Sequence, residues 1–195
     1  MNPSPTGARR RGVAVLATLA LSVTGAVAAI PAVAAPSPVD ATVTDASLTW
    51  GVKESFRNYV TGPIAGGQVT PIGTTTGTGP FTWTGGTGDA ADDASAADVG
   101  FGEGDGVHFQ GHEMDGGYAL DLEFTNPRVV ITSPDSGELR MDVTGREFAG
   151  TTTVGDEYVL TDVPLADLEL SSPEVSEEEL AWTGASATLT EQGSK

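Results

Sequence analysis

Two histidines and one basic, tyrosine-bearing segment hold most of the side chains that could do chemistry in this sequence. His108 and His112 lie in the string GVHFQGHEMDGG, where an unbroken strand would place both on one face of a sheet. Such a pair could ligate a metal, although two histidines alone are more often surface or hydrogen-bonded groups. The sequence has no cysteine and no HExxH motif that would complete a zinc site.

The acidic, glycine-rich stretch from Gly88 to Gly106 is a second place where an ion could bind, and its composition predicts a loop. Glu103 and Asp105 could contribute oxygen ligands to calcium. Calcium needs about six to eight oxygens, however, and the ligand spacing of an EF-hand is absent. A solvated loop without an ion is therefore the preferred interpretation.

Signatures of common enzymes are missing. The sequence contains no GxSxG motif, no phosphate-binding loop and no dinucleotide fingerprint. Its 27 acidic residues always offer a pair for acid–base work, so their number identifies no catalytic pair. We expect a protein that is not an enzyme, and a carbohydrate-active enzyme is the weakest alternative.

The segment SLTWGVKESFRNYVTGP, residues 47–63, is aromatic and basic, and its spacing predicts a helix of about three turns. Thr49 is the predicted N-cap, and Gly62 with Pro63 ends the helix. One face is apolar, at spacings i, i+4, i+7 and i+8: Val52, Phe56, Tyr59 and Val60. By this pattern alone, Tyr59 is a core residue whose hydroxyl group is hydrogen-bonded.

The rest of the chain predicts short strands that must position these groups. Alternating segments begin at Gln68 and recur to the end of the chain, and residues 125–127 and 133–137 are predicted turns. The predicted fold is mostly β, an antiparallel sandwich-like or barrel-like sheet with one short N-terminal α-helix. We expect one domain over residues 47–195, preceded by an extended lead-in over residues 35–46.

The first 34 residues are typical of a secretory signal peptide, because Arg9–Arg11 precede an apolar run and Ala32–Ala34. We expect cleavage after Ala34, with an uncleaved membrane anchor as the alternative. Loss of the three arginines takes the net charge from −18 to −21. Such a chain repels nucleic acid and anionic membranes, so neither is an expected partner. We expect a secreted protein, free or associated with the cell envelope.

Three strings in this order, WGVKESFRNYVTG, FQGHEMDGGYALDLEFTNPRVVI and GELRMDVTG, resemble the HtaA-type haem-binding domain of exported haem-uptake proteins. The resemblance covers most of the chain after the leader. It implies that Tyr59 ligates ferric haem iron, that His112 hydrogen-bonds Tyr59, and that Ser55 lies near the haem propionates. On that basis Phe56 is expected to pack on the porphyrin, and the nearest cationic donors for the propionates are Lys53 and Arg57.

The expected function is non-catalytic capture or relay of ferric haem for iron acquisition, with haem-donor proteins and other envelope haem-uptake proteins as partners. The family's domain usually continues into a C-terminal segment whose aromatic pair packs at the haem, and no such pair precedes Lys195. We therefore expect either a more open haem site or a domain that has lost haem binding. The alternative function is a secreted structural or adhesion domain, steadied by calcium at residues 88–106, in which Tyr59 is only a core residue.

Overall fold

The computed structural model describes residues 10–17, 41–176 and 179–194. These residues form one helix and a twelve-stranded sheet. In chain order the elements are β1 (Arg10–Ala17), β2 (Ala41–Trp50), α1 (Glu54–Thr61), β3 (Gln68–Ile72), β4 (Phe81–Ala90), β5 (Ala97–Gly100), β6 (Gly106–Met114), β7 (Gly117–Ser133), β8 (Ser136–Arg146), β9 (Glu157–Glu169), β10 (Glu174–Val175), β11 (Glu179–Thr183) and β12 (Ser186–Leu189).

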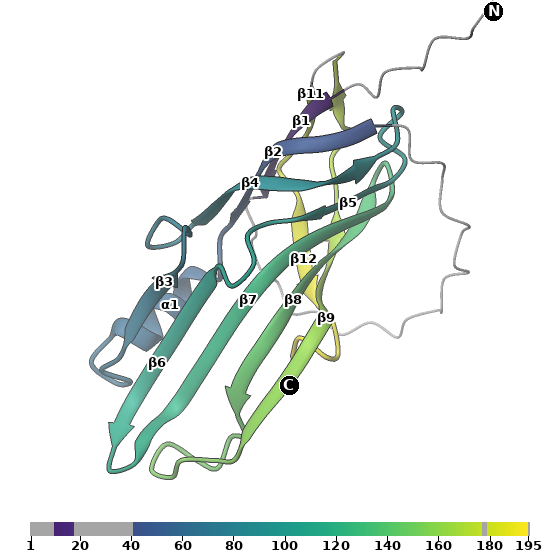
Figure 1. Ribbon diagram of the computed structural model, residues 1–195. Helices are drawn as coiled ribbons and strands as arrows, with labels where there is room; N and C mark the ends of the chain where they lie inside the picture. Colours follow the sequence, from purple (N-terminus) through teal and green to yellow (C-terminus); the bar gives the residue numbers. More distant parts are fainter. Residues whose placement is uncertain (1–9, 18–40, 177–178, 195) are drawn as a thin grey trace, which may run out of the picture.

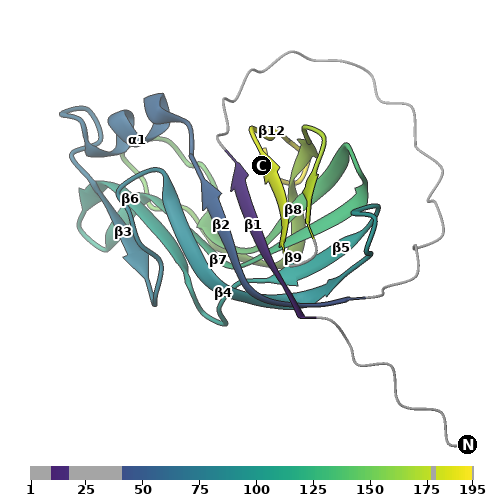
Figure 2. The ribbon, with the colours of Figure 1, turned by 90° about the horizontal axis from the view of Figure 1, so that it is seen from above.

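The strands follow the order β10-β11-β1-β2-β4-β5-β7-β8-β9-β12, and β3 joins through β6, which pairs with β7. Strand β1 runs parallel to β2 and β11, and the remaining described pairs are antiparallel. Figures 1 and 2 show the sheet curling into an open trough, with α1 beside the end formed by β3 and β6. Since β10 and β12 stay the two ends of this order, the sheet does not close into a barrel. The predicted fold class is confirmed.

The core fills the inside of the trough, because alternate residues of each strand point there. Strand β8 shows the pattern clearly: its odd-numbered residues from 137 to 145 are buried and its even-numbered residues are half-buried. The largest fully buried side chains include Trp83, Trp182, Phe81, Phe101 and Phe109. Since the chain has no cysteine, this aromatic core takes the place of disulfide cross-links.

The first described element after the predicted leader is strand β2, which corrects two predictions. Thr49 is not a helix N-cap but a residue of β2, where its hydroxyl group lies 3.2 Å from that of Thr82. Trp50 stacks on Trp83 at a centroid distance of 6.4 Å, and this contact holds the segment in the sheet. The helix is therefore shorter than predicted, and residues 41–46 of the supposed lead-in are part of the domain.

Two predicted irregular segments also belong to strands. The stretch 88–106 contains the end of β4 and the whole of β5, and a side chain on Gly88 would lie 1.9 Å from the Asp98 carbonyl oxygen. Its glycine content thus reflects close pairing of strands as well as turns. Asn126, in the predicted turn at residues 125–127, forms a left-handed bulge (φ 53°) inside the 17-residue β7. The turn at residues 133–137 is confirmed, because Ser133 pairs with Ser136 where β7 meets β8.

The predicted leader overlaps the described chain only in β1, which lies between β2 and β11. The expected cleavage site after Ala34 lies outside the described residues, and cleavage stays a prediction. Within the described ranges, no helix combines the length and apolar character that crossing a membrane requires.

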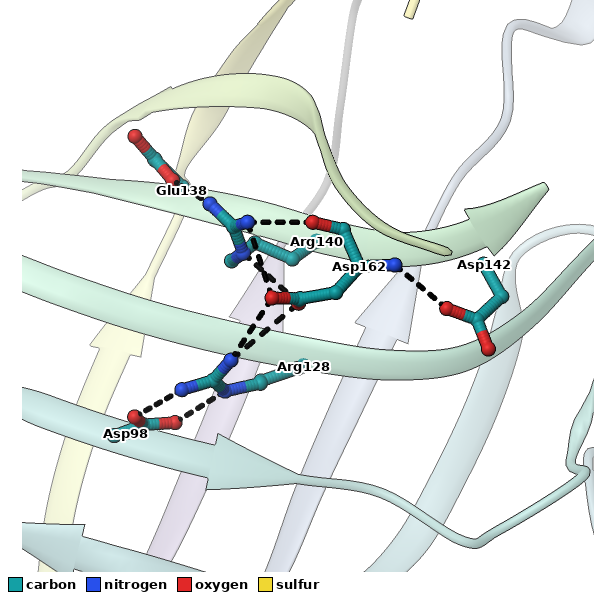
Figure 3. Close-up of polar contacts among 6 residues, drawn as sticks. All are labelled: Asp98, Arg128, Glu138, Arg140, Asp142 and Asp162. Atoms are coloured by element: carbon teal, nitrogen blue, oxygen red, sulfur yellow. Dashed lines mark hydrogen bonds and ion pairs between the residues drawn. The ribbon is translucent and has the colours of Figure 1, made fainter. Parts of the chain in front are cut away.

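The outside of the trough carries an ion-pair network that joins β5, β7, β8 and β9 (Figure 3). Arg128 donates two hydrogen bonds to the Asp98 carboxylate, at 2.6 and 2.5 Å, and lies 3.3 Å from Asp162. Arg140 donates to Asp162 at 2.9 Å, and the Asp162 N–H donates to Asp142 at 2.7 Å. The hydrogen bond from Arg140 lowers the pKa of Asp162 below its ordinary value. The network thus fastens four strands across the face opposite the core.

Candidate ligand-binding site

Tyr59 lies in the last turn of α1, where the helix packs against the sheet. Val60 is fully buried, and the ring of Phe56 lies 5.3 Å from that of Phe109 on β6. The helical spacing that places these two residues against the sheet places Tyr59, half-buried, beside them. The Tyr59 hydroxyl group lies 2.6 Å from Nε2 of His112, a short hydrogen bond between side chains 53 positions apart.

His112 reaches Tyr59 through an irregular strand backbone. Its φ is 55°, in the left-handed region that strand residues rarely adopt, and its N–H donates to the Ala65 carbonyl at 2.7 Å. Ala65 belongs to the α1–β3 loop, so this bond docks the end of the helix region on β6. Strand alternation, which predicted that His108 and His112 share a face, fails at this residue.

His108 has a different environment. Its Nε2 lies 2.6 Å from the Asp121 carboxylate, and its Nδ1 lies 4.0 Å from Glu123. Asp121 also lies 3.4 Å from Arg146. The structure therefore separates the two histidines, one in an ion-pair cluster and one on Tyr59. Among the described residues, no group of three or more His, Cys, Asp or Glu side chains could hold a metal ion.

A pocket opens beside the Tyr59–His112 pair and encloses about 870 Å³ of space open to solvent. Its apolar floor comes from residues of β7, β8 and β9: Leu120, Leu122, Phe124, Val143, Leu160 and Leu165. The Tyr158 ring lies against Gly145, where a side chain would meet the phenolic oxygen at 2.5 Å. The glycine thus lets a second phenol lie against the pocket floor.

A second depression of about 790 Å³ lies at the start of α1, and Trp50, Lys53 and Phe56 are among its lining residues. It shares Leu122, Phe124, Leu165 and Gly193 with the first. The two spaces therefore have one continuous apolar floor, and α1 stands beside both.

Four of the six predicted site residues line one of the two spaces, and the other two line neither. Tyr59 and His112 line the first pocket, and Lys53 and Phe56 line the second depression. Ser55 is exposed and lines neither space.

Arg57 also lines neither space. Its guanidinium donates to the carbonyl oxygens of Val52, Thr78 and Gly79, at 2.9, 3.3 and 3.0 Å. It ties α1 to the loop before β4.

The pocket also contains residues that were not predicted. Leu120 and Leu122 could have been predicted to share one face of a strand, since polar and apolar residues alternate in the string GYALDLEF. Arg146, the cation that lines the first pocket, pairs with Asp121 at 3.4 Å and with Glu157 at 3.7 Å. Nothing in the sequence brings Arg146 and Tyr59 together, because 87 positions separate them.

One of the two residues proposed as calcium ligands, Asp105, already has hydrogen-bond partners in the protein. The Asp105 carboxylate is nearly buried and accepts hydrogen bonds from the backbone N–H of Thr74, at 2.9 Å, and from the Thr74 hydroxyl group. Its oxygens thus serve the turn after β3. Glu103, the other proposed ligand, is exposed.

Comparison with known proteins places the chain in a family. The HtaA family model matches residues 45–195. Among solved structures, the C-terminal domain of HtaA from Corynebacterium glutamicum is 30% identical, with a TM-score of 0.66, over 80% of this chain and 86% of that one. The N-terminal domain of the same protein is 28% identical, with a TM-score of 0.58, over 75% and 97%.

The haem-binding protein HtaB from Corynebacterium glutamicum is 31% identical, with a TM-score of 0.52, over 68% of this chain and 73% of that one. No curated protein matches the sequence. The family match covers more than half of the chain, and the matched structures share its fold. The chain belongs to the HtaA family.

Proposed function

We propose that this protein binds ferric haem, with the phenolate of Tyr59 as the iron ligand and His112 as the hydrogen-bond donor to that phenolate. The observation that carries the proposal is the 2.6 Å contact between the Tyr59 hydroxyl group and His112 Nε2 at the wall of an apolar pocket. Family membership and the likeness to a haem-binding protein support it.

The chemistry of the pair suits ferric iron. Ferric iron is a hard cation, and tyrosine is one of the ligands by which proteins hold haem. A phenol in water ionises only near pH ~10, so the ligand needs a positive iron and a hydrogen-bond donor to stay ionised at neutral pH. An imidazole whose Nε2 carries the proton supplies that donor, and it fixes the direction of the phenol ring as well.

The remaining lining residues suit the rest of the molecule. The apolar floor shared by the two spaces can cover the porphyrin, and Phe56 can pack on it from the helix. Lys53, the cation at the second depression, is the donor that we propose for the propionates. Ser55 lies two residues further along the chain, and its part in propionate binding stays a prediction.

The role that follows is capture or relay of haem outside the cell, without catalysis. Export rests on the predicted leader, and the partners in this role are haem-donor proteins and other haem-uptake proteins of the envelope. The net charge of −18 disfavours nucleic acid and anionic membranes as alternative partners.

Titration with haemin, followed by absorbance, tests the proposal. The full chain should give a saturable Soret band and a ferric charge-transfer band, and Tyr59→Phe should abolish both. Tyr158→Phe removes the other phenol of the pocket and should retain both bands, which makes it the matched control. His112→Ala should still bind but release haem faster, since the phenolate loses its donor. Absence of a saturable band in the wild type, or its loss in Tyr158→Phe only, would overturn the proposal.

A further inference from the structure

A large apolar side chain stands exposed at the mouth of the pocket. Among the described residues, four large apolar side chains are more than half exposed: Ile64, Phe148, Val159 and Val175. Single exposed residues of this kind are common on protein surfaces and need no explanation. Phe148 differs from the other three because it lines the pocket that contains Tyr59 and His112. It is also the most exposed of the four, at 83%.

The loop that carries Phe148 joins β8 to β9 and is fixed at its base. The Glu147 N–H donates to the Asp156 carbonyl at 2.9 Å, and Arg146 donates to the Gly155 carbonyl at 3.2 Å. Gly155 is needed there, because a side chain on it would lie 1.9 Å from the Glu147 carbonyl oxygen. These contacts set where the loop leaves the sheet, directly beside the pocket.

The tip of the same loop is held much less. No hydrogen bond joins residues 148–154 to another described residue, and Gly150 has a φ of 99°. Gly150 and Thr151 line the pocket together with Phe148. A loop with a fixed base and few contacts at its tip can change conformation at low cost. Phe148 can therefore move towards the pocket while β8 and β9 keep their pairing.

We infer that Phe148 is a haem-binding residue, which covers the face of the porphyrin left open to solvent and so slows the release of haem. The inference rests on the proposed function. Burial of an exposed phenyl ring against a flat aromatic surface is favourable in free energy. Of the four exposed side chains, only this one lines the pocket. Tyr158 and Leu160 on β9 continue the same apolar wall from the loop into the floor.

Release of haem to an excess of apomyoglobin, measured by absorbance, tests the inference on the full chain. Phe148→Ala should raise the dissociation rate by about tenfold or more, the range expected for loss of a buried phenyl ring. Phe148→Leu should stay within a few-fold of the wild type because it keeps most of the apolar contact. Ile64→Ala is the matched control: Ile64 is 75% exposed but does not line the pocket, so the rate should not change.

Two further measurements distinguish the proposed covering of haem by Phe148 from an effect on iron ligation or on folding. The Soret maximum should be the same in all of these variants, since the iron ligand is unchanged. Amide hydrogen exchange over residues 148–154 should slow when haemin is added to the wild type. A rate in Phe148→Ala equal to that of the wild type, or exchange unaltered by haemin, would overturn the inference.

The two proposals fail in different ways. If the wild type gives a Soret band that Tyr59→Phe abolishes, but Phe148→Ala releases haem at the normal rate, the proposed function stands and the role of Phe148 is refuted. If the wild type gives no saturable band, both are refuted.

Discussion

Gly67→Ala should weaken both the fold and the haem site, because Gly67 lies where the α1–β3 loop meets β6. A side chain at this position would lie 1.8 Å from the Gln110 carbonyl oxygen, whereas real Cβ contacts essentially never fall below 3.0 Å. The Gly67 N–H also donates to the Val60 carbonyl at 2.8 Å. The methyl group cannot be accommodated by a side-chain rotation, since its neighbours are backbone atoms.

The structure sets the size of the effect. The loop and β6 must separate by about 1.2 Å, the difference between 3.0 and 1.8 Å. Overpacking of this kind costs about 1–3 kcal/mol, which lowers the thermal midpoint of a chain of this length by roughly 2–12 °C. The same movement disturbs the bond from the His112 N–H to the Ala65 carbonyl, and with it the 2.6 Å contact between His112 and Tyr59. Haem affinity should therefore fall together with stability.

Thermal unfolding followed by circular dichroism, and haemin titration of the same samples, measure the two effects. Gly100→Ala is the matched control, because Gly100 also lies in the sheet but its added methyl group meets nothing within 4 Å. That variant should be as stable as the wild type or slightly more stable. If Gly67→Ala matched Gly100→Ala in midpoint and in haem affinity, the docking of the α1–β3 loop would not control the position of Tyr59.

Two further substitutions test the charged groups. Asp162→Asn should lower stability by up to about 1 kcal/mol at pH 7, because Arg140 and Arg128 each lose one of their two carboxylate partners. Asparagine tolerates the left-handed backbone at this position (φ 49°). Since the folded-state pKa of Asp162 is lowered, its stabilisation is present above the ordinary aspartate pKa and is lost as the pH falls through the folded-state value. The difference from the wild type in urea unfolding should thus vanish in acid, and a difference independent of pH would contradict this. Arg57→Gln should cost about 1–3 kcal/mol in the same assay, because three backbone carbonyls, including that of Gly79, lose a charged donor, while haem affinity stays unchanged. A normal midpoint with weakened haem binding would instead assign Arg57 to the propionates.

The parts of the site that could be predicted are those set by local spacing. The helical period of Phe56, Tyr59 and Val60 predicted which face of α1 meets the sheet, and the structure packs all three against the core. The start of the helix could not be predicted, because Trp50 is held in β2 by Trp83, a partner 33 positions away. The local helix propensity of this segment is overridden by a tertiary contact, which a local sequence pattern cannot reveal.

The stretch 88–106 was misassigned for a related reason. Glycine and aspartate are typical of turns, but Gly88 is required because β5 approaches β4 closely at that position. Strand alternation failed at His112 because one left-handed residue changed the direction of its side chain. The pairing of strands depends on the whole sheet, and so does the position of a single irregular backbone residue. Neither can therefore be predicted well from one sequence.

The elements that form the proposed haem site differ in how many contacts hold them in place. The floor belongs to β7, β8 and β9, which pair with one another along most of their length and are fastened outside by the network of Arg128 and Arg140. Tyr59, in contrast, lies on an eight-residue helix that packs on β3 and β6 and is tied down by the Arg57 and Ala65 contacts. A short helix has little stability of its own, so these few contacts decide where the phenol lies. The rigid sheet therefore shapes the pocket, and the docking of α1 sets the distance between the phenol and His112.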